Sequence, residues 1–154
     1  MSTRSPVSQK VARPTNRSRH CSRPFARPVA QFALTTALRR AIRGFYECYR
    51  KEKWELCYNR IDPRLLAGSK VDFNCYRDSL VAFKQRYGDV IIRMIDVGET
   101  HKSKRDRRPF AYASIIWQDR HAEFHVFRER WIFHDARWYT RVVGLITHQE
   151  QASL

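Results

Sequence analysis

The first 46 residues contain no aspartate or glutamate, and this absence divides the 154-residue chain into two unequal parts. Ten lysines and arginines precede the first acidic residue, Glu47, whereas the remaining 108 residues carry 20 basic and 15 acidic side chains. Two thirds of the formal net charge of +15 therefore belongs to the N-terminal third. The rest of the chain is only mildly basic, so the overall charge says little about its partner.

Three further absences narrow the class of protein. No apolar run approaches the roughly 20 residues that span a bilayer, which predicts a soluble protein with no membrane partner. None of the five glycines is paired, and there is no phosphate-binding loop or Gly-x-Ser-x-Gly turn. We therefore expect no nucleotide cofactor, and no cofactor of any other kind. The four cysteines form no Cys-x-x-Cys pair, which favours free thiols in a reducing compartment over a zinc site.

The N-terminal segment 1–32 is expected to be a disordered basic tail. It is rich in serine and arginine, and four prolines interrupt its first 28 residues. Three interpretations remain open: a tail that binds nucleic acid or another acidic surface, an organellar transit peptide, or a passive extension from an over-extended start site. A transit peptide would place the protein in an organelle; otherwise we expect it in the cytoplasm. Residues 149–154 are expected to be a disordered C-terminus.

Between these ends, residues 33–148 are predicted to form one α+β domain of three helices followed by four strands. Helical spacing of apolar residues begins at Ala33, recurs from Trp54 to Ile61, and recurs again up to Tyr87, with Asn74 as a candidate N-cap and Gly88 as a stop. Asp62-Pro63 should end the second helix. The period then falls to two, and strands are predicted at 90–97, 110–117, 122–133 and 138–146. Helices followed by a strand meander predict segregated helices packed on a curved antiparallel sheet.

Two phrases of the sequence resemble a known family. Phe45-Tyr46, Trp54-Glu-Leu-Cys-Tyr and Ile61-Asp-Pro are similar to the opening helices of the nuclear transport factor 2-like superfamily, the cystatin-like α+β cone, in its SnoaL-like branch. The segment from Phe127 to Tyr139 is similar to that superfamily's last hairpin, with Ala136 where glycine is usual, which predicts a looser turn. The resemblance implies a cone-shaped fold and a possible homodimer through the sheet. It is nearly silent about function, because members include dehydratases, isomerases, transport factors and uncharacterised domains.

The resemblance also implies a small-molecule pocket inside the cone. By strand alternation His125 and Glu129 share one face, and with Tyr46 or Tyr112 nearby they would form an acid/base set. His125 and Glu129 are separated by roughly 13 Å along the strand, so they would act on opposite ends of a substrate, or only one would matter. The alternative is that Glu129 pairs with an arginine across the sheet while His125 lies at a solvated edge. Two histidines four apart on a strand cannot share an ion, and no metal site is expected.

The loop 101–108 is the second candidate site, because its cations could neutralise several phosphates of a nucleic acid or the acids of a protein. It has no aromatic side chain for stacking on bases, and it could instead be a solvated hairpin tip. The candidate residues are Lys102, Lys104, Arg105, Arg107 and Arg108. With no reactive set clearly present, we expect a non-enzymatic binding or scaffold protein. The alternative is a small-molecule binder or weak acid/base enzyme of the dehydratase or isomerase type.

Overall fold

A 25-residue helix, α1 (Ala26–Arg50), opens the part of the chain that this computed structural model describes, residues 26–69 and 71–141. The helix begins seven residues before the expected start at Ala33. Pro28 does not prevent this start, because the first four N–H groups of a helix have no intrahelical partner. The predicted apolar face is buried as expected: Leu38, Ile42, Phe45 and Tyr49.

Three shorter helices follow where the sequence predicted two. They are α2 (Trp54–Tyr58), α3 (Pro63–Gly68) and α4 (Phe73–Tyr87). The unpredicted helix α3 starts at the very proline that was taken as a stop. Proline suits the first turn of a helix, and the carboxylate of Asp62 caps that turn by accepting a hydrogen bond from the Arg64 N–H at 3.2 Å.

The ends of α4 follow the usual capping rules, with one correction. Its N-cap is Asp72, whose carboxylate accepts a hydrogen bond from the Cys75 N–H at 2.8 Å, and not Asn74, which lies inside the helix. Gly88 ends the helix with a φ of 79°, as predicted.

Five antiparallel strands follow the helices: β1 (Ile91–Val97), β2 (His101–Lys102), β3 (Pro109–Gln118), β4 (Phe124–His134) and β5 (Arg137–Thr140). The sheet order is β1-β3-β4-β5, and the short β2 pairs with β3. The four predicted strands are confirmed, and β2 is an addition within the expected loop. Strand β5 ends at Thr140; the part of its predicted range beyond residue 141 lies outside the described residues.

The turn between β4 and β5 is tight, not loose as the Ala136 substitution suggested. Asp135 and Ala136 are its two central residues, with φ of 47° and 59°, and His134 pairs directly with Arg137. Positive φ at both central residues defines the type I′ turn, which matches the twist of a hairpin. The hairpin therefore imposes a left-handed conformation on alanine.

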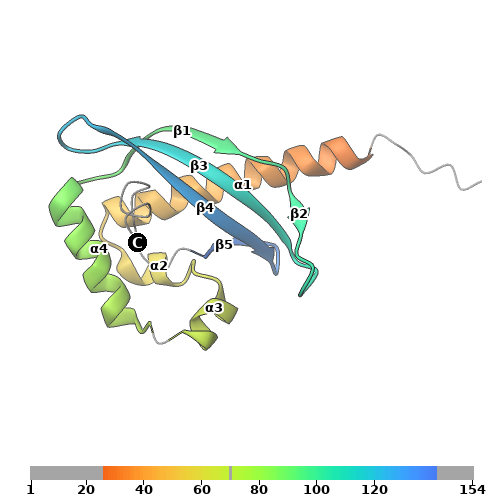
Figure 1. Cartoon of the computed structure of the whole chain (residues 1–154), viewed down its shortest axis with the longest axis horizontal. Helices are drawn as coiled ribbons and strands as arrows, with labels where there is room; N and C mark the ends of the chain where they lie inside the picture. The colour runs from red at the N-terminus through yellow and green to blue at the C-terminus, as the bar shows by residue number, and fades with distance from the viewer. Residues whose placement is uncertain (1–25, 70, 142–154) are drawn as a thin grey trace, which may run out of the picture.

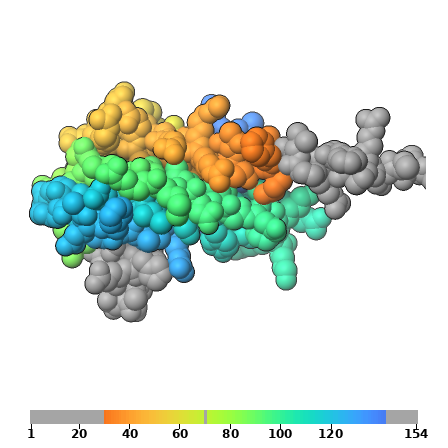
Figure 2. All heavy atoms as spheres, turned by 90° about the horizontal axis from the view of Figure 1, so that it is seen from above, coloured from red at the N-terminus to blue at the C-terminus, as the bar shows by residue number. Residues whose placement is uncertain are grey.

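The helices and the sheet form two layers. Figure 1 shows α1 running along the sheet, with α4 at one end and α2 and α3 beside β5. In Figure 2 the orange and yellow helices lie above the green-to-blue sheet. Most of the buried apolar side chains come from α1, α4 and the inner faces of β3 and β4. These observations establish an α+β fold whose helices cover one face of an open antiparallel sheet.

Candidate functional site

A buried carboxylate lies where α1 crosses the inner face of the sheet. Glu129 of β4 is 3% exposed. The Tyr46 hydroxyl of α1 donates a short hydrogen bond to one of its oxygens, and the Trp131 indole N–H donates to the other at 2.8 Å. The Tyr46 ring in turn stacks on Phe127, with ring centroids 6.0 Å apart. Two of the predicted pocket residues, Tyr46 and Glu129, therefore meet.

Burial without a cation changes the acid–base properties of this pair. Desolvation raises the pKa of Glu129 from 4.5 to about 7, although the hydrogen bonds from Tyr46 and Trp131 oppose the rise. Desolvation, and then the neighbouring Glu129 carboxylate, raises the pKa of Tyr46 well above 10.0. Glu129 thus exchanges a proton near neutral pH while Tyr46 stays a donor. The alternative, in which an arginine across the sheet pairs with Glu129, is not seen among the described residues, where Glu129 forms no ion pair.

The other two predicted pocket residues lie elsewhere. Tyr112 projects from the outer face of β3 and is 57% exposed. His125 shares the inner face with Glu129 but lies at the far end of β4, where its ring stacks on Trp117 at a centroid distance of 4.5 Å. The structure therefore supplies a Tyr46–Glu129 pair, and it separates that pair from Tyr112 and His125.

His125 is instead part of the turn between β3 and β4. Its Nε2 lies 3.0 Å from the carboxylate of Asp119, whose other oxygen accepts backbone hydrogen bonds from His121 and Glu123. Burial opposes ionisation of Asp119, but these hydrogen bonds outweigh it and lower its pKa. Sequence reasoning missed Asp119; an aspartate at the start of a polar turn is the signal that points to such capping.

The same turn is the one place in the described chain where three metal-ligand types converge. Single ligand atoms of Asp119, Glu123 and His125 lie within 4.8 Å of one another. The spacing of histidines in the sequence pointed only to His121 and His125 as a pair of metal ligands, so this group was not predicted. Both oxygens of Asp119 already accept hydrogen bonds, which accounts for the arrangement as a turn.

The basic loop divides into two kinds of cation. Arg108 has only 11% of its side chain exposed and inserts its guanidinium between Asp62 and Asp106, with two nitrogens 3.0 and 3.2 Å from the Asp62 oxygens. It therefore closes an ion pair between the loop and the start of α3. The remaining four candidates are exposed, and none forms an ion pair in the described part of the chain: Lys102, Lys104, Arg105 and Arg107.

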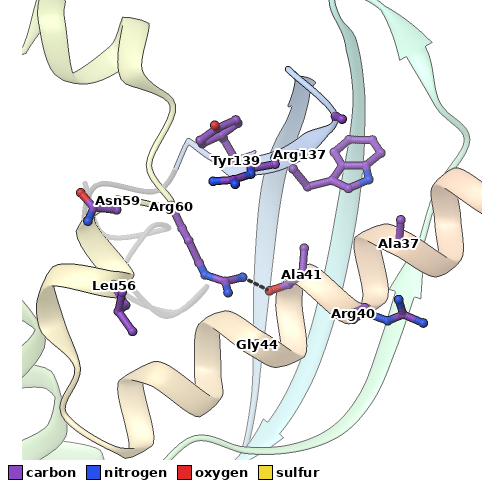
Figure 3. A pocket seen from close by; sticks show the side chains of 11 residues that line it. Ala37, Arg40, Ala41, Gly44, Leu56, Asn59, Arg60, Arg137 and Tyr139 are labelled. Atoms are coloured by element: carbon purple, nitrogen blue, oxygen red, sulfur yellow. Dashed lines mark hydrogen bonds between the residues drawn. The ribbon is translucent and has the colours of Figure 1, made fainter.

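A hollow of about 640 Å³ lies between α1, the segment after α2, and β5 (Figure 3). Its walls carry Arg40, Arg60 and Arg137, together with small residues of α1 and the aromatic residues of β5. Sequence reasoning missed this site because its arginines come from three separate segments. The regular spacing of alanine and glycine on α1 was the available signal.

Comparisons of the chain with protein-family models, with curated proteins and with solved structures found no match. No helix in residues 26–69 or 71–141 combines the length and apolarity needed to cross a bilayer.

Proposed function

We propose that this chain is a non-enzymatic binding domain of the nuclear transport factor 2-like type that engages a polyanionic partner, nucleic acid in the first instance. One observation carries the proposal: four exposed cations fall within six residues of the loop, at 102, 104, 105 and 107, with no carboxylate partner in the described chain. Binding of such a cluster to a nucleic acid is favourable because it releases the counterions condensed on the phosphates.

The inner face offers less support for catalysis. Glu129 has both oxygens occupied by Tyr46 and Trp131 and is almost completely buried, so a substrate would have to displace an indole or a phenol to reach it. Its raised pKa is the one observation that favours the alternative, an acid/base enzyme of the dehydratase or isomerase type.

The electrostatic proposal is tested with a labelled 20-nucleotide single-stranded RNA and fluorescence anisotropy. Replacing Lys102, Lys104, Arg105 and Arg107 by glutamine should weaken binding at least tenfold and flatten its dependence on salt. The matched control replaces two lysines and two arginines elsewhere on the surface: Lys51, Lys53, Arg77 and Arg93. Deleting residues 1–25, which leaves α1 intact, measures the share of the tail.

The outcomes separate the partners. Equal losses in both quadruple variants, or affinity that ignores salt, would contradict a role for the loop. Tighter binding of poly-glutamate than of RNA at equal charge would assign the site to an acidic protein instead.

We also propose that the protein forms a homodimer through the outer face of the sheet. Met94, Tyr112 and Phe124 on that face are 50%, 57% and 66% exposed, which leaves apolar surface for a partner. Sedimentation velocity should show a dimer that Tyr112→Glu dissociates. Phe32→Glu, at an aromatic of α1 that is 71% exposed, should leave the dimer intact. A monomeric wild-type protein at about 100 µM would refute the proposal.

A further inference from the structure

Several arginines of this domain form ion pairs, but the arginines around the hollow between α1 and β5 do not. Arg50, Arg64, Arg77 and Arg108 each lie within 3.3 Å of a carboxylate oxygen. Within residues 26–69 and 71–141, none of the three that line the hollow forms an ion pair, and the lining contains no aspartate or glutamate: Arg40, Arg60 and Arg137.

The nearest acids along the sequence do not neutralise the hollow. Glu55 precedes the lining residue Leu56 and belongs to a separate depression beside Trp54. Asp135 precedes the lining residue Ala136, and its carboxylate lies 3.2 Å from Nε2 of His134. Three arginines that have no carboxylate partner among the described residues therefore line one concave surface.

Arg60 is held in position for binding. Figure 3 shows its side chain crossing the hollow to α1, where a terminal nitrogen donates to the Ala41 carbonyl at 3.2 Å. Gly44 makes room for it, because a Cβ at this position would lie 3.2 and 3.3 Å from the two terminal nitrogens. The other N–H groups of this guanidinium have no acceptor among the described residues. A half-buried, fixed guanidinium with free donors loses little entropy on binding an anion.

Strand β5 forms the wall of the hollow opposite α1. It is held in place by a backbone hydrogen bond and supplies apolar surface. The Thr140 N–H donates to the Arg60 carbonyl at 2.8 Å, which ties β5 to the segment that carries Arg60. Trp138 lines the hollow at 5% exposure, and its indole N–H has no hydrogen-bond partner in the described chain. Tyr139, the next residue of β5, also lines the hollow, and Ala37, Ala41 and Gly44 line it with little side-chain bulk. A buried unpaired donor is costly in a folded protein.

We propose that this hollow binds a small organic phosphate that joins the phosphate to an aromatic or similarly apolar body. Its volume lies within the range of ligand sites, and guanidinium groups match phosphate oxygens in geometry. Three cations favour a dianion over a carboxylate. The aromatic wall of β5 and the small residues of α1 accommodate the apolar part. The site is separate from the 101–108 loop, so it does not depend on the proposed nucleic-acid function.

The test titrates phenyl phosphate into the full chain and measures heat. Saturable one-to-one binding with a Kd of about 1 mM is expected for a ligand of this size. Inorganic phosphate, phenol and benzoate should each bind about tenfold more weakly or worse. Inorganic phosphate lacks the aromatic ring, phenol lacks the phosphate, and benzoate carries one negative charge in place of two.

Two substitutions locate the site. Arg60→Gln should weaken the binding of phenyl phosphate about tenfold or more. Arg137 is exposed, so Arg137→Gln leaves the core unchanged and should weaken binding about threefold or more. Arg93→Gln on β1 makes the same charge change far from the hollow and should leave Kd unchanged. Gly44→Ala, which displaces Arg60 without altering charge, should also weaken binding.

Three results would overturn the inference. One is the absence of saturable heat up to about 10 mM phenyl phosphate. Another is an equal effect of Arg93→Gln, Arg60→Gln and Arg137→Gln, which would indicate general attraction to a basic protein. The third is equally tight binding of benzoate or inorganic phosphate, which would remove the assignment to an organic phosphate.

Discussion

Glu129 and Asp62 are about equally buried, at 3% and 1% exposure, but their surroundings differ in charge. Neutral donors, the Tyr46 hydroxyl and the Trp131 indole, surround Glu129. Asp62 receives both terminal nitrogens of Arg108 and also caps α3. The first carboxylate is poised to take up a proton, whereas the second is locked into an ion pair.

The difference separates two roles for buried acid in one domain. The Asp62–Arg108 pair joins the 101–108 loop to the helical layer, across 46 positions of sequence, and so contributes to the fold. Glu129 joins α1 to β4 through hydrogen bonds whose strength depends on its protonation. Removing the partner of Asp62 should therefore destabilise the fold more than removing a partner of Glu129. A change of pH should act mainly through Glu129.

The largest effect is expected from Arg108→Ala. The substitution leaves Asp62 buried without its cation, which should lower the free energy of unfolding by about 3–5 kcal/mol. Urea denaturation measures the loss. Arg64→Ala removes a largely exposed partner of Asp106 from the same cluster and should cost far less. A loss under about 1 kcal/mol for Arg108→Ala would show that the pair behaves as a surface pair.

The pH dependence of the free energy of unfolding tests the environment of Glu129. The folded-state pKa of Glu129, about 7, lies above the ordinary 4.5, so the folded state binds its proton more tightly than the unfolded chain. The stabilisation is complete below about pH 4.5 and is lost as the pH rises through about 7. Glu129→Gln mimics the protonated form. Relative to wild type, the variant should gain about 3 kcal/mol between pH 4.5 and 8. Parallel profiles of unfolding free energy would contradict a raised pKa.

The order and type of the main elements could be predicted from the sequence because they depend on local periodicity. The apolar face of α1 and the alternation along β3 and β4 are examples. The start of α1 and the existence of α3 could not, since both contain prolines whose effect depends on their position within the first turn. The type I′ turn at Ala136 was missed because the β4–β5 pairing imposes a conformation that alanine does not favour.

The candidate sites were predictable only where their residues share one element. Glu129 and Trp131 are two positions apart on β4, so alternation alone puts them on one face, and their contact follows from it. The contact of Asp62 with Arg108, and the gathering of Arg40, Arg60 and Arg137, depend on tertiary packing of distant segments. Charge runs in the sequence could not reveal that Arg108 pairs with Asp62 while Arg105 is exposed.

Tyr46→Phe addresses the hydrogen bonds of Glu129 directly. It leaves one carboxylate oxygen without its donor and should cost about 1–3 kcal/mol of unfolding free energy, more at pH 8 than at pH 5, because the ionised form needs the donor most. Tyr76→Phe is the matched control. The Tyr76 hydroxyl is buried on α4 and has no hydrogen-bond partner in the described residues, so its removal should cost little. Equal losses measured by urea denaturation would mean that the Tyr46 bond adds no stability.

The smallest effect is expected at Arg105, three positions from Arg108 in the same loop. Arg105 is exposed and forms no ion pair within the described chain, so Arg105→Gln should leave the free energy of unfolding unchanged. If the loop binds nucleic acid, the same substitution should still weaken RNA binding, since each phosphate contact contributes to the salt-dependent affinity. Paired measurements of unfolding and RNA anisotropy on Arg105→Gln and Arg108→Ala would separate the two roles. A loss of stability at Arg105 comparable to that at Arg108 would contradict the division of this loop into a buried ion pair and a free cationic surface.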